Sequence, residues 1–343
     1  MTSQGSTGVE VGNVPPVRKG RGERSNRTVN IERIALPLFW IIEIAIFGSI
    51  KPHLFLTTSN FSSIFGSQAV VAVLALAVLA PALSGDYDLS CASNLVLSSM
   101  LVAILTVNDH WPLAAAAAIA IITGIFVGLV NGWLVTEFQI ESLIVTLGTG
   151  TVLQGIVIWI SNSATISGVS PGLVNATISD KLFGIPYEFY YVVALALVMW
   201  YVFEFTPLGR RLLFVGRGRD VARLSGLRVE RLRMGALGAS GLVSALAGIL
   251  YAGSTGSADP SSGLQFLLPA FAAVFLGATS IQPGKFNPWG TLIAIYFLVT
   301  GITGLELLGV DPSVQDVFYG GALVLAVVLS QIARRQRLMV RRN

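Results

Sequence analysis

The sequence has 343 residues and a formal net charge of +4; 53% of its residues are hydrophobic, only 12% are charged, and its mean hydropathy is +0.73. A soluble domain of this length would carry about 25% charged residues, so the composition excludes an ordinary soluble protein and indicates a lipid bilayer. The single cysteine, Cys91, excludes an intramolecular disulfide and a metal site built from cysteines.

Residues 1–33 are polar and rich in Gly, Ser and Arg, which predicts a disordered, basic cytoplasmic tail. No small-residue cleavage site follows the first apolar run, so this run is interpreted as a retained span. The chain then contains ten apolar segments of a length that crosses a bilayer, or part of it where the segment is broken. They are 34–50, 63–83, 94–107, 112–136, 143–161, 190–206, 234–254, 268–281, 288–308 and 314–333. The predicted fold class is therefore all-α and polytopic, with a transmembrane domain over 34–333 and a second basic tail over 334–343.

Lysine and arginine fall in three clusters, which hold 19 of the 22 basic residues. The clusters lie in the N-terminal tail, in the central loop 207–233 and in the C-terminal tail. Positive charge near the ends of spans stays on the cytoplasmic side, so both termini and the central loop are expected inside. Six segments separate the first two clusters and four separate the last two, and both numbers are even, as this orientation requires. The basic character thus follows from topology, and nucleic acid is not expected as a partner.

Two of the segments, 94–107 and 268–281, are too short to cross alone. Each follows a stretch rich in Gly, Ser and Asp: the first break (Ser84–Ser90) and the second break (Gly253–Gly263). The breaks occupy equivalent places in segments 2–5 and 7–10, which start on opposite sides, so an inverted repeat is possible. Short, interrupted segments at matching positions of two halves point to a transport pathway. The alternative is that both are ordinary connecting loops.

Acidic and small polar residues cluster at these breaks. A carboxylate at membrane depth costs on the order of 3 kcal/mol, so it usually faces a cavity or a partner. A carboxylate before a short helix can equally cap its first N–H groups. The candidate pathway residues are Asp86, Asp88, Ser90, Ser93, Asn94, Ser257 and Asp259.

Three glycines in the fourth segment, Gly124, Gly128 and Gly132, repeat every four residues. This spacing places a smooth ridge on one helix face, where another backbone can approach closely. We interpret the ridge as a helix-packing surface.

The central loop contains eight arginines, which is more than topology requires. Residues 220–227 can form a short helix that ends near Gly226. Such a helix suits docking on a soluble partner, whereas the alternative is a solvated loop near anionic lipid headgroups. The residues expected to couple to the partner are Asp220, Ala222, Arg223, Leu224, Ser225 and Gly226.

Several motifs are missing from the sequence. No G-x-x-x-x-G-K-[ST] phosphate loop is present, so the chain is not expected to hydrolyse ATP itself. His53 and His110 are isolated beyond span ends, and no Ser/His/Asp grouping is visible. No catalytic residue, metal site or cofactor of its own is therefore expected.

Three motifs, in order, resemble the permease subunits of bacterial ABC importers for monosaccharides, the ribose, xylose and arabinose group, which includes the autoinducer-2 permeases. Residues 85–90 resemble the family's G-G-I-D-L-S segment. Residues 206–210 and 222–226 resemble its T-x-x-G-R and A-A-R-L-S-G stretches, and residues 272–280 resemble its A-A-V-x-x-G-G-T-S stretch. The resemblance covers roughly residues 34–333.

This resemblance implies a permease in the bacterial cytoplasmic membrane, surrounded by lipid and paired with a second permease copy. It also implies two ATPase domains that bind ATP and Mg²⁺, and an extracytoplasmic binding protein that delivers the sugar. The segment around 220–226 would be the coupling helix that sits in a groove of the ATPase. Closure of the ATPase pair would then switch the pathway between outward and inward access.

The sequence departs from the family motifs beside the expected pathway. Asp86 stands where the family has its second glycine, and Ala92 replaces another glycine. An acidic E-L-D-A run is replaced by 266–270, which has no acid. These changes leave the solute open: a monosaccharide is expected, and an amino acid, a nucleoside or an autoinducer is the alternative. An ion-coupled transporter would favour paired intramembrane carboxylates, and a membrane enzyme would need a polar constellation that is not visible.

Overall fold

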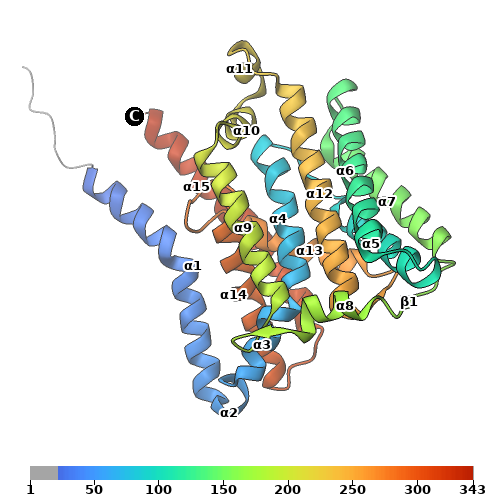
Figure 1. Ribbon diagram of the computed structural model, residues 1–343. Coiled ribbons are helices and arrows are strands. Elements are labelled where there is room, and N and C mark those ends of the chain that lie inside the picture. Colours follow the sequence, from blue (N-terminus) through green and yellow to red (C-terminus); the bar gives the residue numbers. More distant parts are fainter. Residues whose placement is uncertain (1–21, 343) are drawn as a thin grey trace, which may run out of the picture.

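The computed structural model describes residues 22–342, with side chains described for 33–328, and this part of the chain is almost entirely helical (Figure 1). Eight helical stretches in it are long and apolar enough to cross a membrane, and the shorter apolar helices Gly263–Gly277 and Val314–Val328 match the two remaining expected segments. The chain is an all-α polytopic membrane protein. The helices that form the apolar segments are α1 (Gly22–Ile50), α3 (Thr58–Ser67), α4 (Ala69–Ser84), α5 (Cys91–Ala103), α6 (Leu113–Glu137), α7 (Ser142–Ile160), α9 (Tyr187–Phe205), α12 (Val229–Thr255), α13 (Gly263–Gly277), α14 (Pro288–Leu307) and α15 (Val314–Arg342).

Short elements connect these helices. They are α2 (Pro52–Phe55), α8 (Pro171–Val174), α10 (Pro207–Arg217), α11 (Arg219–Leu224), the π-helical turns Ile104–Asn108 and Asn175–Ser179, and the strands β1 (Ile166–Ser167), β2 (Lys181–Leu182), β3 (Ile185–Pro186) and β4 (Ser257–Ala258). β1 pairs antiparallel with β4, and β2 pairs antiparallel with β3. The sheet content is thus confined to two pairs of two-residue strands.

The ends of the chain differ from the expected tails. α1 begins at Gly22, inside the segment 1–33 that was predicted to be disordered, and α15 continues to Arg342. A helix that is already formed by an apolar span adds one backbone hydrogen bond for each further residue, whereas starting a helix is costly. Extension into the basic segments is therefore favoured. Residues 1–21 lie outside the described part.

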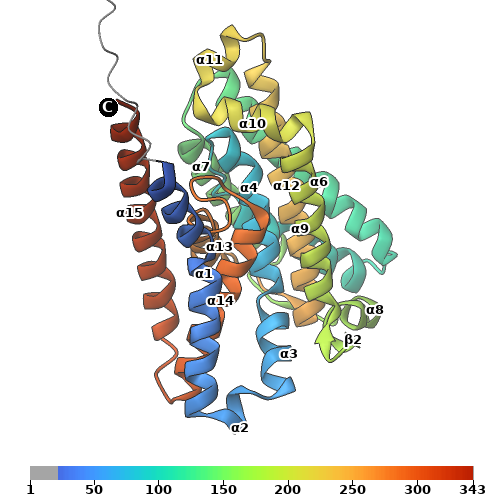
Figure 2. The same ribbon diagram turned by 90° about the vertical axis from the view of Figure 1, so that its left-hand side faces the viewer.

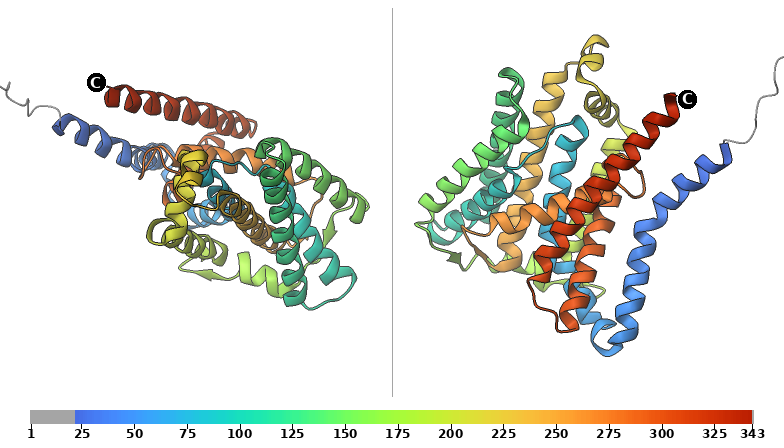
Figure 3. Two further views of the ribbon diagram at one scale, coloured as in Figure 1. Left: turned by 90° about the horizontal axis from the view of Figure 1, so that it is seen from above. Right: turned by 180° about the vertical axis from the view of Figure 1, so that it is seen from behind.

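The described parts of the three basic segments lie at one end of the bundle (Figures 1 and 2). The start of α1, the pair α10 and α11, and the C-terminal end of α15 are all found there. We call this the arginine end. The opposite end carries α2, α8 and the connection 161–186 (Figure 3). This arrangement agrees with the even numbers of segments between the clusters. That the arginine end faces the cytoplasm remains a prediction.

The centre of the bundle is α4, which is apolar on every side, as expected for a helix with no lipid-facing or water-facing surface. All sixteen of its residues are buried. α12 packs against α4, α5 and α6, and α14 packs against α13 and α4. α1 stands at the edge, where it contacts α14 (Figure 1).

The glycine ridge of α6 faces α12. A Cβ atom on Gly128 would lie 2.2 Å from the carbonyl oxygen of Leu237, and one on Gly124 would lie 2.7 Å from that of Gly241. A Cβ on Gly132 would lie 2.6 Å from the Cα of Met234. The two backbones therefore approach so closely that a side chain at any of these three positions would collide with α12.

The two helix sets have the relations that an inverted repeat predicts. α5 contacts α6 and α7, as α13 contacts α14 and α15; α12 contacts α5, as α4 contacts α13. α4 and α12 each end in a left-handed glycine, Gly85 (φ 80°) and Gly256 (φ 64°). Three residues later, Asp88 and Asp259 each accept a hydrogen bond from the N–H two positions on. The breaks lie at opposite ends of the bundle.

Candidate transport and coupling sites

Asp86, in the first break, is fully buried and belongs to an ion-pair cluster. Its carboxylate accepts two hydrogen bonds from Arg233 of α12, Nε to Oδ2 at 2.8 Å and Nη2 to Oδ1 at 2.7 Å. Arg219, at the start of α11, donates from Nη2 to the same Oδ1 at 3.0 Å. These contacts identify the partners of Asp86, and its place in the solute pathway stays a prediction. The carboxylate of Asp86 binds two arginines of the basic loop, because a buried charge requires an opposite charge.

The arginine loop closes over the first break. Arg219 Nη2 also donates to the carbonyl oxygen of Gly85 at 3.0 Å. A Cβ atom on Gly216 of α10 would lie 2.2 Å from the carbonyl oxygen of Leu83, so α10 touches the end of α4 backbone to backbone. The first break is thus held from outside by the segment expected to contact a soluble partner.

On its inner side the first break joins a buried polar network. Asp88 accepts hydrogen bonds from the Ser90 N–H at 3.0 Å and from its hydroxyl. Asn131 of α6 donates to Ser90 Oγ at 2.8 Å, and Asn94 donates to the Gly241 carbonyl of α12 at 3.1 Å. Asp88, Ser90 and Asn94 therefore converge where α5, α6 and α12 meet.

α7 contacts both breaks. Near its start, Ser142 Oγ accepts a hydrogen bond from the Tyr87 N–H, and Thr146 Oγ1 accepts one from the Leu89 N–H, each at 3.0 Å. Three turns further on, Gln154 donates to the carbonyl oxygen of Pro260 in the second break at 2.6 Å. One helix therefore connects the two interruptions by direct hydrogen bonds.

The second break is covered by the connection 161–186. Ser257 lies in β4 and pairs with β1, and the N–H of Gly168 donates to the carbonyl oxygen of Gly256 at 3.1 Å. Asp259 caps its own turn through the N–H of Ser261 at 2.8 Å. Ser257 and Asp259 thus lie at the opposite end of the bundle from Asp86 and Asp88. The candidate pathway residues form two groups, one at each break.

Ser93 is half-buried on α5, beside α7. A Cβ atom on Gly150 of α7 would lie 3.4 Å from Ser93 Oγ, an ordinary contact. Ser93 is therefore the one member of the first group that is not fully buried.

The expected coupling segment forms α11 and the turn after it. Ala222 is buried against Val215 and Val229. On the outer face, Val221 is 58% exposed and Leu224 is 89% exposed. Arg223 pairs with Glu230 of α12. Two apolar side chains on a short helix at the outer edge of the arginine end (Figure 2) form a surface that a soluble partner can cover.

Gly226 ends this segment with φ at 81°, a conformation that favours glycine, and has no heavy atom within 4 Å of a Cβ position. Glycine is therefore favoured at position 226 because of its backbone conformation, and not because a larger side chain would collide with a neighbour.

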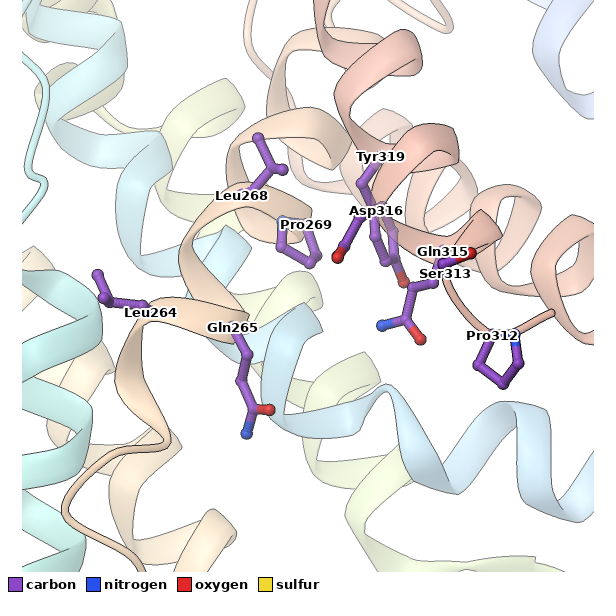
Figure 4. Close-up of a pocket in the computed structure, with 9 residues that line it drawn as sticks. All are labelled: Leu264, Gln265, Leu268, Pro269, Pro312, Ser313, Gln315, Asp316 and Tyr319. Atoms are coloured by element: carbon purple, nitrogen blue, oxygen red, sulfur yellow. The ribbon is translucent and has the colours of Figure 1, made fainter.

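An open cavity of about 470 Å³ lies between α13 and the start of α15 (Figure 4). Gln265, Gln315 and Asp316 line it, together with the buried side chain of Tyr319. None of the residues singled out from the sequence lines it.

Sequence reasoning did not identify the partners of the first break. Arg219 and Arg233 were grouped with the other loop arginines, although Arg233 lies inside a stretch that is otherwise a span. Ser142, Thr146 and Gln154 are hydroxyl and amide residues within an apolar helix. Polar residues at such positions were the available sign that the helix faces protein.

Comparison with known proteins agrees with this architecture. Residues 60–327 match the family described as the branched-chain amino acid transport system / permease component. The D-allose transport system permease protein AlsC of Escherichia coli is 31% identical over 85% of this chain and 89% of its own length. The ribose import permease protein RbsC of Bacillus subtilis is 32% identical over 86% and 92%, and the autoinducer 2 import system permease protein LsrD of Photorhabdus laumondii is 31% identical over 86% and 89%. The chain belongs to this family of ABC importer permeases, multi-pass proteins of the bacterial cytoplasmic membrane.

Proposed function

We propose that this chain forms the pathway by which an ATP-driven importer moves a monosaccharide across the cytoplasmic membrane. The observation that carries the proposal is the position of α11, which exposes Val221 and Leu224 at the arginine end and bonds the first break through Arg219. A force applied to α11 therefore acts on the interrupted segment directly. The curated relatives named for D-allose and ribose support a monosaccharide as the solute.

The proposal includes the partners of such an importer. A separate ATPase subunit, which binds ATP and Mg²⁺, docks on α11 through the exposed Val221 and Leu224, with Asp220 beside them. An extracytoplasmic binding protein delivers the solute at the opposite end, and a second copy of the permease completes the pathway. Lipid surrounds the remaining apolar faces.

The pathway runs beside α7, between the two breaks. α7 bonds the first break through Ser142 and Thr146 and the second break through Gln154. Ser93, Ser257 and the polar groups of the breaks are the candidates for solute contact, and Asp86, whose carboxylate binds two arginines, supports the first break.

The proposal is tested by reconstituting the permease with its ATPase and binding protein in proteoliposomes. ATP-dependent uptake is measured for D-ribose, D-allose, autoinducer-2, leucine and adenosine, and uptake of a monosaccharide is expected. Preferential uptake of leucine, adenosine or autoinducer-2 would refute the sugar assignment. ATP-independent uptake driven by an ion gradient would refute the proposal that the importer is driven by ATP.

The docking surface has a matched control. Leu224→Asp places a charge on the proposed ATPase contact and is expected to abolish co-purification of the ATPase. Phe183→Asp changes a side chain that is also 89% exposed, but at the opposite end, and is expected to leave co-purification unchanged. Equal ATPase binding in both variants would place the docking surface elsewhere.

A further inference from the structure

The two arginines that bind Asp86 differ in their surroundings. The Arg233 side chain is only 5% exposed and binds both carboxylate oxygens, whereas the Arg219 side chain is 44% exposed and binds Oδ1 alone. Two parallel N–H···O bonds fix an arginine more firmly than one, and they fix its orientation as well. One contact is therefore enclosed and the other is open to water.

The difference matters because a buried carboxylate cannot remain without a partner. Loss of Arg233 would leave the charge of Asp86 in the protein interior, a strongly unfavourable state. Loss of Arg219 would leave Asp86 still paired with Arg233. The contact with Arg219 can therefore break and form again while the contact with Arg233 persists.

The water-exposed contact of Asp86 also involves α11, the helix on which the ATPase is proposed to dock. Arg219 is the first residue of α11, and its Nη2 bonds both the carbonyl oxygen of Gly85 and the carboxylate of Asp86. These two residues begin the first break, immediately after α4. Any displacement of α11 must therefore stretch these two bonds or pull the first break with it.

We propose that Asp86 is a positioning residue that transmits movement of α11 into the first break, with Arg233 as its fixed anchor and Arg219 as its exchangeable contact. The inference rests on the proposed function, since it assigns the movement of α11 to the ATPase. When α11 moves, Arg219 leaves Asp86 and the first break is released. When α11 returns, the contact forms again and the first break is held closed.

The chain contains its own probe for this movement. Cys91 follows the first break directly, is fully buried, and is the only cysteine in the sequence. Its rate of modification by N-ethylmaleimide therefore reports opening of the first break in the full-length permease, without any added cysteine.

The first measurement uses the permease alone, in detergent or lipid. Arg219→Gln is expected to raise the labelling rate of Cys91 about three- to tenfold, as expected for loss of a half-exposed, charge-assisted contact. Arg217→Gln removes the same charge from the neighbouring helix α10, where Arg217 forms no ion pair with any residue that the structure describes, and is expected to leave the rate unchanged. Thermal midpoints of both variants should match the unmodified protein, since Asp86 keeps Arg233. Equal labelling in the two variants overturns the inference.

The second measurement uses the complex with ATPase and binding protein. Arg219→Gln is expected to keep ATPase co-purification but to lower solute uptake per ATP hydrolysed at least about fivefold, the lower range of ordinary coupling between sites. Loss of ATPase co-purification in Arg219→Gln would make Arg219 a docking residue and overturn the inference. Failure of the unmodified permease to bind any ATPase would refute the proposed function instead, and the Cys91 labelling separates these two results.

Discussion

Gly128 sits where α6 and α12 approach most closely, and replacing it with alanine is a quantitative test of that contact. The added methyl would lie 2.2 Å from the carbonyl oxygen of Leu237 and 3.0 Å from the Cα of Gly238. Both neighbours are backbone atoms, which cannot rotate away as a side chain can. The two helices would have to separate by about 1 Å to restore an ordinary contact distance.

The size of the effect follows from two opposing terms. Overpacking a well-packed interface costs about 1–3 kcal/mol, and the upper part of this range applies because Gly124 and Gly241 fix the same spacing nearby. Alanine in place of glycine within a helix gains about 1 kcal/mol. Gly128→Ala is therefore expected to lower the free energy of unfolding by about 1–2 kcal/mol.

Gly235 supplies the matched control on the partner helix. It lies in α12 but has no heavy atom within 4 Å of a Cβ position. Gly235→Ala is therefore expected to raise the free energy of unfolding by up to about 1 kcal/mol, the difference in helix propensity between alanine and glycine. The free energy of unfolding is measured by titrating each variant from mild detergent into sodium dodecyl sulfate. If the two alanine variants agree within about 0.5 kcal/mol, the close approach of α6 and α12 is not a source of stability.

Other positions give further expectations. Gly226→Ala meets no atom but needs a left-handed backbone, so it should cost about 1–2 kcal/mol in thermal or detergent unfolding, and Gly226→Asn should cost less. Thr146→Val removes the acceptor for the Leu89 N–H and should cost about 1–3 kcal/mol and speed labelling of Cys91, whereas Thr151→Val, exposed on the same helix, should do neither. Lys285→Met breaks a partly exposed ion pair with α9 and should cost at most about 1 kcal/mol, an effect that high salt should erase in the unmodified protein; a larger, salt-independent loss would contradict this.

The architecture was largely predictable from the sequence because a bilayer imposes strong rules on it. Each apolar segment had to be a helix, and the basic clusters had to share one side. The structure has helices at all ten places, and the ends that carry the clusters lie together. The glycine spacing of α6 gave the packing face as well, although it did not indicate which helix would lie against it. Segment boundaries were less accurate: α5 and α13 begin at Cys91 and Gly263, earlier than expected, because hydropathy reports an apolar environment and not the first backbone hydrogen bond of a helix.

The role of Asp86 could not be predicted from the sequence. Its partners lie 133 and 147 positions away, and nothing in a single sequence pairs one of eight loop arginines with a given carboxylate. The rule that an intramembrane acid faces a cavity or a partner left both outcomes open. From the sequence, a role in the pathway and a role as a helix cap were equally compatible with its position. The partner is what the structure contains.

The two breaks share a turn but differ at one position, and this difference separates the two ends of the protein. Asp88 and Asp259 cap equivalent turns, whereas Asp86 is matched by Ser257. At the arginine end the break is held by ion pairs to Arg219 of α11 and Arg233 of α12, and α11 is the helix proposed to bind the ATPase. At the opposite end Ser257 is held by two-residue strand pairing with the connection 161–186. Under the proposed function the two ends are therefore opened by different agents: movement of α11 at the arginine end, and contact with the loaded binding protein at the strand pair. An ion pair can break on displacement while its buried charge stays compensated, which suits the end where ATP supplies the work.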